Sequence, residues 1–389
     1  MLTVLGAALP AVAQDPDTRE GAIAQAQAAK AQNLPPLTET KAERVTDVIN
    51  NFFTPKPRGF YPYFDSVYSG GGFTLGAGYS WAVRDKATFA VQGLYTIKNY
   101  KLIEARALSP GHLNGRLTLG GVFGWRDVTQ AAYYGLGMDT TIDDRSNFGF
   151  NETYAEGDAT LRPSDWTMLA GTVAFEDYDL GPPSQGRSPS IFDVHTPATA
   201  PALGVDTTYV HTSGTAAIDW RTTPGYSRTG GYYGITLHDF ANTNGGLDFN
   251  RLDGEVIQNI PILRETWVIS VRGRVQTSLR DDTVPYFLLP SLGSGSTLRA
   301  YTSWRFRDRN SMLTQAEFRW IPNRLAMDMA FFYDAGKVTS RAEDFSFKGL
   351  AHDWGVGVRF HGPTTVPLRI EVARGSEGIN LVFSGSAAF

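Results

Sequence analysis

The sequence of 389 residues has no cysteine, which excludes disulfides, thiolate metal sites and a cysteine nucleophile. It also has no excess of positive charge. The 35 Lys and Arg residues stand against 39 Asp and Glu residues, so the composition does not point to nucleic acid as a partner. No apolar run approaches the roughly 18 residues that a membrane-spanning helix needs. A helical membrane protein is therefore excluded.

Aromatic residues and glycine are abundant instead, with 8 Trp, 17 Tyr, 23 Phe and 41 Gly. From about residue 70 onwards the hydrophobic pattern has a period of two, which is typical of β-strands. In residues 73–81 the odd positions are apolar and the even positions are Thr, Gly or Ser, and residues 353–360 alternate in the same way. The sequence therefore predicts an all-β protein.

Strands with one charged face and one aromatic face occur in two kinds of all-β protein. A soluble sandwich buries the apolar face, whereas a membrane barrel turns that face to lipid and lines its lumen with the polar face. We favour an outer-membrane barrel over residues 58–389, because the strands continue to the last residue and an export signal precedes them. The polar faces are also rich in charge, with Arg116, Arg126, Arg272, Arg274, Glu317, Arg359 and Arg369.

The number of strands gives a test of this architecture. We count ten predicted strands between residues 71 and 279 and five between residues 311 and 389. Bacterial single-chain barrels have even strand numbers, short periplasmic turns and long outer loops. We therefore expect sixteen antiparallel strands, with the missing one in 129–146 or 280–292. The long segments 178–205 and 281–310 should be extracellular.

The N-terminal segment predicts export. Residues 1–13 are mostly apolar and end in an A-x-A cleavage pattern, so we interpret them as a signal peptide. Its basic n-region is missing, which fits a truncated start and leaves an ordinary apolar segment as the alternative. Residues 14–57 form a linker that contains a short amphipathic helix at 40–53, with a capping box at Thr40 and Glu43.

Common catalytic and cofactor motifs are missing from the sequence. Its six histidines have no HExxH or paired metal spacing, and there is no GxSxG elbow or P-loop. One enzymatic alternative is that His211 and Ser213, on one face of a predicted strand, act in a membrane-embedded hydrolase. We prefer two polar residues that face the lumen, because no third orienting group is evident. No cofactor, metal site or enzymatic activity is therefore predicted.

The C-terminal third holds a more specific set of charges. A Gly/Ser-rich run from Gly293 ends in Arg299 and is followed by strands that carry Glu317 and Asp334. Alternation turns both carboxylates inward. A guanidinium can bridge two carboxylates through charge-assisted hydrogen bonds, provided that the loop folds into the lumen. Three unrelated lumenal charges neutralised by water are the alternative, and spacing alone does not separate the two.

The ordered motifs of this region resemble the bacterial surface antigen family, the superfamily of the outer-membrane barrel-assembly subunit and the two-partner-secretion transporters. The resemblance is strongest over 285–389 and rests on Gly-Ser-Gly-Ser-x-Leu-Arg-Ala-Tyr, Ala-Glu-Phe-Arg, Phe-Tyr-Asp-Ala-Gly, Asp-Trp-Gly-Val-Gly-Val-Arg and a terminal Phe. It implies a sixteen-stranded barrel whose sixth extracellular loop, here about 281–310, folds inward. The loop motif would comprise Gly293, Gly295, Leu298, Arg299, Ala300 and Tyr301.

The resemblance also implies roles for single residues. Arg299 would be the loop-tip arginine, with Glu317 and Asp334 as its lumenal partners. The C-terminal signal that the cell's barrel-assembly machinery reads would comprise Leu381, Phe383 and Phe389. The first strand (about 71–83) and the last (378–389) would meet at a weak seam, and the glycines of the first strand fit this because glycine loosens a strand.

Two departures from the family pattern affect these expectations. Ala300 stands where the motif usually has glycine, so the loop tip is expected to differ slightly. The segment before residue 58 is also too short for the periplasmic POTRA domains that bind client chains in the family. The chain therefore resembles a minimal member without them.

We consider three functions. The first, which the family resemblance implies, is assisting the insertion or translocation of proteins, or lipids, at the outer membrane through the seam between the first and sixteenth strands, with client proteins as partners. The second is a passive pore or structural barrel, whose arginine-rich lumen would favour anions, although an inward loop argues against high conductance. The third, the hydrolase, would require an essential histidine.

Overall fold

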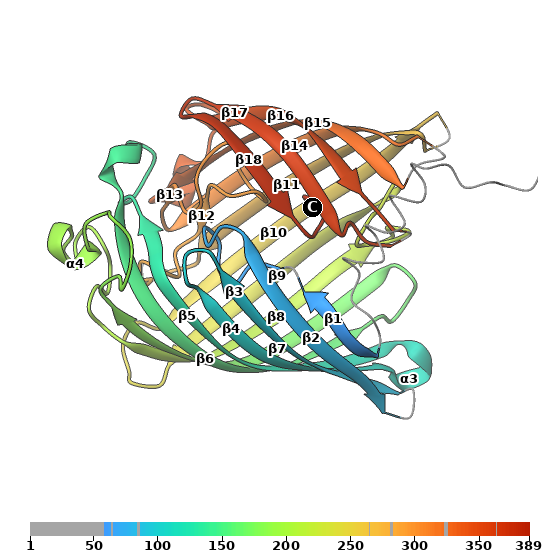
Figure 1. Cartoon of the computed structure of the whole chain (residues 1–389), viewed down its shortest axis with the longest axis horizontal. Coiled ribbons are helices and arrows are strands. Elements are labelled where there is room, and N and C mark those ends of the chain that lie inside the picture. Colours follow the sequence, from blue (N-terminus) through green and yellow to red (C-terminus); the bar gives the residue numbers. More distant parts are fainter. Residues whose placement is uncertain are drawn as a thin grey trace, which may run out of the picture. The chain divides into compact units, whose positions relative to one another are not determined.

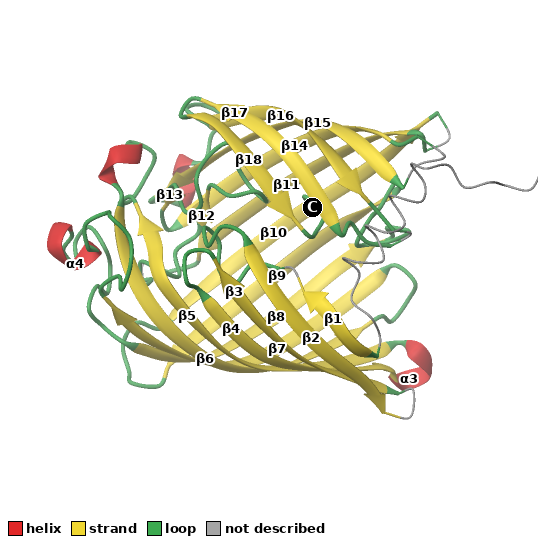
Figure 2. Cartoon of the chain, viewed as in Figure 1, coloured by secondary structure: helices red, strands yellow, loops and turns green. Residues whose placement is uncertain are grey.

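The computed structural model describes residues 58–63, 65–83, 86–263, 265–280, 283–322, 326–362 and 364–389. The expected signal peptide (1–13), linker (14–57) and helix (40–53) lie outside the described residues. In the described ranges no helix is long and apolar enough to span a membrane. Strands dominate, and the few helices are short segments within the connections (Figure 2).

The main sheet has sixteen strands, as predicted. They are β1 (Gly59–Tyr63), β2 (Thr74–Val83), β3 (Ala87–Thr96), β4 (Lys101–Gly111), β5 (Leu117–Tyr133), β6 (Ser146–Leu161), β7 (Thr167–Gly181), β8 (Thr207–Asp219), β9 (Gly230–Asn242), β10 (Phe249–Ile262), β11 (Trp267–Ser278), β14 (Asn310–Trp320), β15 (Met327–Thr339), β16 (Ala351–Phe360), β17 (Leu368–Gly375) and β18 (Gly378–Ser384). Short elements in the connections are α3 (His112–Gly115), η1 (Ile142–Asp144), α4 (Ile191–Val194), η2 (Ala342–Asp344) and the paired strands β12 (Ser291–Leu292) and β13 (Phe306–Arg307).

Each strand of the main sheet pairs antiparallel with its neighbour in chain order, with β11 next to β14. The sheet curves round a central space, so that its first and last strands both lie on the near side of the view (Figure 1). Among the described strands no ladder joins β1 to β18, and each of them has one neighbour only. The sheet is therefore a barrel with an open seam between β1 and β18.

The sixteenth strand is not where the sequence predicted it. It is β1, at the start of the sheet, whereas residues 129–133 extend β5 and the range 280–292 contributes only β12. Two features hide β1 from pattern recognition. It has five residues, and Pro62 interrupts it, which an edge strand tolerates because one side of its backbone has no partner strand. The seam is thus formed by Gly59–Tyr63 and not by residues 71–83.

The glycines of β2 have a different role from the expected one. A Cβ atom at Gly78 would lie 2.4 Å from Cζ of Tyr61, and one at Gly76 would lie 2.4 Å from a methyl group of Leu94. Neither clash can be relieved cheaply, because both neighbours are buried. These glycines therefore make room for large side chains inside the barrel. They lie on β2, which is separated from the seam by β1.

The side chains on the two faces of the sheet indicate that its outer face meets lipid. The outer face is apolar and exposed, and tryptophans gather at the end with mostly short connections: Trp81, Trp166, Trp220 and Trp320. This matches the aromatic girdle of a membrane barrel. The inner face buries charged and amide side chains, among them Glu104, Glu152, Gln276 and Arg319. A soluble sandwich would bury the apolar face, so this alternative is wrong.

Candidate functional site

The connection from β11 to β14 carries the predicted loop motif into the barrel. Gly293 has a φ of +106°, and a Cβ atom there would lie 2.3 Å from the carbonyl oxygen of Thr302, so only glycine fits this turn. The Gly293 N–H donates to Oγ1 of Thr297, which stabilises the turn. Leu298 and Arg299 are fully buried beyond it. This part of the loop motif is therefore buried.

Arg299 contacts both predicted carboxylates. Its Nε and Nη2 donate to the two oxygens of Asp334 at 2.7 and 2.8 Å, a bidentate pair. Its Nη1 donates to Oε1 of Glu317 at 2.6 Å. The guanidinium also lies 3.5 Å from the ring centroid of Phe332, which covers its face. We call Arg299, Glu317 and Asp334 the lock.

The lock belongs to a larger buried network that the sequence did not predict. Glu371 accepts from Nη1 of Arg299 at 3.2 Å, from Arg359 at 2.9 Å and from Arg369 at 2.8 Å. Arg359 also donates to Glu317 at 2.6 Å. Three guanidinium groups thus face three carboxylates, all almost fully buried. Buried charges are stable only when they are paired, so each member depends on the others.

Alternation in the sequence places Glu371, Arg359 and Arg369 on inward faces, but it does not say that they meet. They lie on β16 and β17, whereas Glu317 and Asp334 lie on β14 and β15. Only the curvature of the sheet and the insertion of the loop bring the five side chains around Arg299. The signal available in the sequence was a charged residue at an inward position of each of the strands β14–β17.

The residues next to Arg299 hold the loop against the last strands. The Ala300 N–H donates to Asp353 at 3.1 Å, and Asn380 on β18 donates to the Arg299 carbonyl at 2.8 Å. Ala300 does not have a positive φ, so alanine in place of the usual glycine causes no backbone strain. A Cβ atom at Gly295 would lie 2.6 Å from Val382, also on β18. The loop tip therefore packs directly on one edge of the seam.

The same loop also contacts the segment beside the other edge. Trp304 stacks on Tyr68 with a centroid separation of 4.8 Å, and its Nε1 donates to the Ser69 carbonyl at 2.9 Å. The hydroxyl oxygens of Ser69 and Ser303 are 2.9 Å apart. Ser69 lies in the connection between β1 and β2. The loop consequently bridges the seam from the inside.

A disulfide between Ser69→Cys and Ser303→Cys should therefore form readily in the exported protein. The two oxygens are already in contact, and the native chain has no other cysteine to compete. After the chain is cleaved by protease between residues 69 and 303, non-reducing electrophoresis shows whether the two fragments stay linked by the disulfide. The control pair is Ser69→Cys with Ser294→Cys, because Ser294 bonds within the loop and not to Ser69. Equal bond formation in both pairs would contradict the bridging position.

Several other predicted residues do not join the lock. Leu381 and Phe383 lie exposed on the outer face of β18, but β18 ends at Ser384, so the predicted continuation of this strand to residue 389 is wrong. The chain turns inward there, and the ring of Phe389 lies 6.0 Å from the guanidinium carbon of Arg272 in the lumen. Phe389 therefore does not share the outer face of Leu381 and Phe383.

The histidine that could have supported a hydrolase has different partners from the expected ones. His211 lies 2.9 Å from Glu176 and 3.0 Å from His238, and Phe240 stacks on its ring. Glu176 is the orienting group that the sequence did not reveal. Among the described residues the hydrogen bonds of the His211 ring go to Glu176 and His238, not to Ser213, and no group of three or more metal-ligating side chains is found there. The geometry gives the hydrolase no support.

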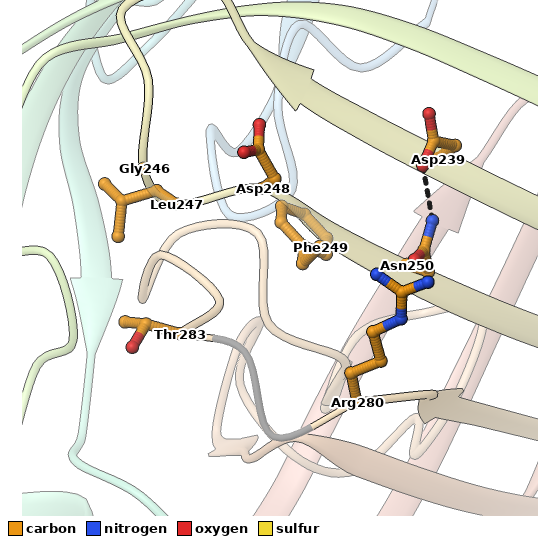
Figure 3. Close-up of a pocket in the computed structure, with 8 residues that line it drawn as sticks. All are labelled: Asp239, Gly246, Leu247, Asp248, Phe249, Asn250, Arg280 and Thr283. Atoms are coloured by element: carbon orange, nitrogen blue, oxygen red, sulfur yellow. Dashed lines mark hydrogen bonds between the residues drawn. The ribbon is translucent and has the colours of Figure 1, made fainter.

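A pocket of about 430 Å³ lies near the end of the barrel with the long connections, apart from the lock (Figure 3). In it, Asn250 donates a hydrogen bond to Asp239. The pocket lies between the β9–β10 connection and the start of the inward loop, and it is lined by Asp239, Gly246, Leu247, Asp248, Phe249, Asn250, Arg280 and Thr283. None of the lock residues reaches it, so we do not assign it a function.

Comparisons with known proteins agree with the barrel fold. A model of the Omp85 superfamily domain matches residues 70–376. Among solved structures, BamA from Haemophilus ducreyi lacking POTRA domains 1–3 is 14% identical with a TM-score of 0.58, covering 84% of this chain and 68% of that one. CdiB from Escherichia coli is 13% identical with a TM-score of 0.57 and covers 85% of this chain. CdiB from Acinetobacter baumannii is 10% identical with a TM-score of 0.52 and covers 81%.

The chain spans 62% and 57% of the two CdiB structures, respectively. At these identities the structural likeness concerns the fold alone. No curated protein matches the chain. The matched family region begins within the β1–β2 connection and ends just before β18, so it contains every residue of the buried network around Arg299.

Proposed function

Because the chain belongs to the Omp85 superfamily of outer-membrane β-barrels, as the family match over residues 70–376 shows, we propose that it assists the insertion or translocation of proteins at the outer membrane. Clients would engage the seam between β1 and β18. The observation that carries this proposal is that, among the strands that the structure describes, neither β1 nor β18 pairs at the seam. The two CdiB structures and BamA share the fold.

An open seam has a direct chemical consequence in a membrane. The outer edges of β1 and β18 present backbone N–H and C=O groups that no neighbouring strand satisfies in the described part of the chain. In hydrocarbon each such group costs several kcal/mol, so an added strand is strongly favoured there. An extended client segment can satisfy these groups by pairing with either edge. Both edges are short, with five and seven residues, which keeps such pairing reversible.

The lock supports this proposal by fixing the inner wall of the seam. Arg299 holds the loop against β14, β15 and β17, and the loop in turn contacts β18 and the β1–β2 connection. A client at the seam would therefore meet an ordered surface on the lumenal side. We assign Arg299, Glu317 and Asp334 this positioning role.

A passive pore is less well supported. The inward loop occupies the lumen, and the arginines that would attract anions are paired, Arg272 with Glu255 at 2.6 Å and Arg274 with Asp253 at 3.2 Å. Their charges are thereby largely neutralised. We further propose that the cell's barrel-assembly machinery reads Leu381, Phe383 and Phe389 before folding, since Phe389 is turned into the lumen afterwards.

Depletion of the protein, followed by quantitative proteomics of the outer membrane, tests the proposed function. We expect selective loss of particular barrels or surface proteins, which would also identify the clients. Expression of the native chain should restore them, and so should Arg341→Ala, which removes only an exposed ion pair with Glu343. An unchanged outer-membrane proteome would contradict client handling and favour a structural barrel.

A further inference from the structure

One connection at the short-loop end of the barrel is unusual. Residues 220–229 join β8 to β9 and are longer than the other connections at that end, which comprise residues 84–86, 112–116, 162–166, 263–266, 321–326 and 361–367. Short connections mark the periplasmic end of an outer-membrane barrel. A longer connection with polar and glycine residues would normally extend into solvent, yet Tyr226 and Ser227 are buried.

This connection crosses the central space of the barrel. A Cβ atom at Gly225 would lie 2.4 Å from the carbonyl oxygen of Thr364 and 3.8 Å from Cα of Thr365. Both threonines belong to the connection between β16 and β17. In the sheet, β9 is separated from β16 by β10, β11, β14 and β15, which is about 24 Å along a flat sheet at ~4.8 Å per strand. The two connections can meet only if one reaches across the lumen.

Tyr226 anchors the crossing segment by a hydrogen bond and by stacking. It is 2% exposed, and its hydroxyl donates to Oδ2 of Asp328 on β15 at 2.7 Å. The other oxygen of this fully buried carboxylate has no hydrogen-bond partner among the described residues. The ring of Tyr226 stacks on His361 with a centroid separation of 4.3 Å and an angle of 16°. Tyr226 is thus the hydrogen-bond donor of Asp328.

Further contacts tie the segment to the C-terminal strands. Arg319 on β14 donates to the Ser227 carbonyl, and its guanidinium lies 5.5 Å from the Tyr226 ring centroid. Tyr226 also packs in a small apolar cluster with Val268, Ile321 and Val366, and Ala387 adds to it. The contacts are therefore distributed over β14, β15 and the β16–β17 connection. Such a spread is expected of a structural tie and not of a chance contact between two loops.

We propose that residues 220–229 form a periplasmic strap that closes the floor of the lumen. The strap links β8 and β9 to β14–β17 across the barrel, so it also holds the two halves of an open sheet together while the seam is unpaired. The lumen then has two barriers in series, the inward loop at the extracellular side and the strap at the periplasmic side. This inference concerns permeability through the lumen and does not depend on client handling at the seam.

Conductance of the purified full chain in planar lipid bilayers tests the closure. Because two barriers in series limit flow, Tyr226→Ala and Arg299→Ala should each raise the conductance only slightly. The increase in conductance of the double variant should be several-fold larger than the sum of the two single increases. The control is Tyr209→Ala combined with Arg299→Ala, since Tyr209 is buried near the long loops and bonds to the Leu247 carbonyl. A double variant that conducts no more than Arg299→Ala alone would overturn the proposal.

A second measurement compares two cysteine variants that leave Tyr226 in place. Ser227 is buried in the strap and Thr222 is exposed in it, and the chain has no native cysteine. With a polar maleimide added to the purified barrel, Ser227→Cys should react many-fold more slowly than Thr222→Cys, and adding Tyr226→Phe should raise its rate. Equal rates for the two single variants would show that the strap is not docked. The conductance and labelling results do not depend on whether depletion of the protein causes a loss of clients, so the two proposals can fail separately.

Discussion

Arg299→Ala should release the inward loop from the barrel. The substitution leaves Glu317, Asp334 and Glu371 with one guanidinium fewer in a site without solvent access. Breaking a buried ion pair by removal of one partner costs about 3–5 kcal/mol, and here one side chain serves three carboxylates. We expect protease cleavage within residues 293–309 in intact cells, where the native loop is protected. Clients lost on depletion should not be restored by this variant.

Two further variants separate the lock from a general effect of charge. Arg299→Lys keeps the charge but cannot bind Asp334 with two parallel hydrogen bonds, so its loop should be cleaved at an intermediate rate. Arg341→Ala removes an arginine from an exposed ion pair and should behave like the native chain. Arg305 is not a suitable control, because it is buried and pairs with Glu377. Full protection of the loop in Arg299→Ala would mean that the lock does not hold it.

Glu371→Ala should have an effect of similar size, although the sequence did not mark this residue. Glu371 accepts hydrogen bonds from Arg299, Arg359 and Arg369, so its loss leaves three buried guanidinium groups to share two carboxylates. The uncompensated positive charge should destabilise β17 and the loop together, by about 3–5 kcal/mol. This change can be measured by electrophoresis of samples heated to increasing temperatures. The transition temperature is the one at which the band shifts from the position of the folded barrel to that of the unfolded chain.

The matched control for this residue is Glu343→Ala, which removes the carboxylate of the exposed pair with Arg341 and should leave the transition temperature within error of the native value. A double variant, Glu371→Ala with Arg369→Ala, should recover part of the loss, because it removes one of the unpaired cations. If Glu371→Ala were as stable as Glu343→Ala, the network around Arg299 would not contribute to the stability of the barrel.

Most strands could be located from the sequence because their signal is local. A period of two with aromatic residues on one face and charge on the other determines both the strand and the face that meets lipid. The fifteen strands predicted by alternation all appear in the structure near their predicted positions. β1 was not predicted, because five residues that include a proline are too few to show an alternating pattern. The end of β18 was placed too far along, because Ala387 and Phe389 continue the alternation of Leu381 and Phe383, with polar Ser386 between the two pairs.

The C-terminal motifs predicted the lock only in part. The family resemblance selected Arg299, Glu317 and Asp334, because spacing alone left three unrelated lumenal charges as an equal alternative. Glu371, Arg359 and Arg369 could not be chosen among the other inward charges. Their contacts depend on the curvature of the sheet and on how deeply the loop enters, which are properties of the whole barrel.

The sequence by itself determined the class of fold and the positions of fifteen strands, because alternation is a local pattern. The sixteenth strand was expected from the even strand number of such barrels, and the inward loop with Arg299 at its tip was implied by the family resemblance. Only the tertiary structure decided which strands border the seam, which charges surround Arg299 and that residues 220–229 reach β14–β17. The physical reason is that these contacts join segments far apart in the chain, and a curved sheet brings them together without leaving a local pattern.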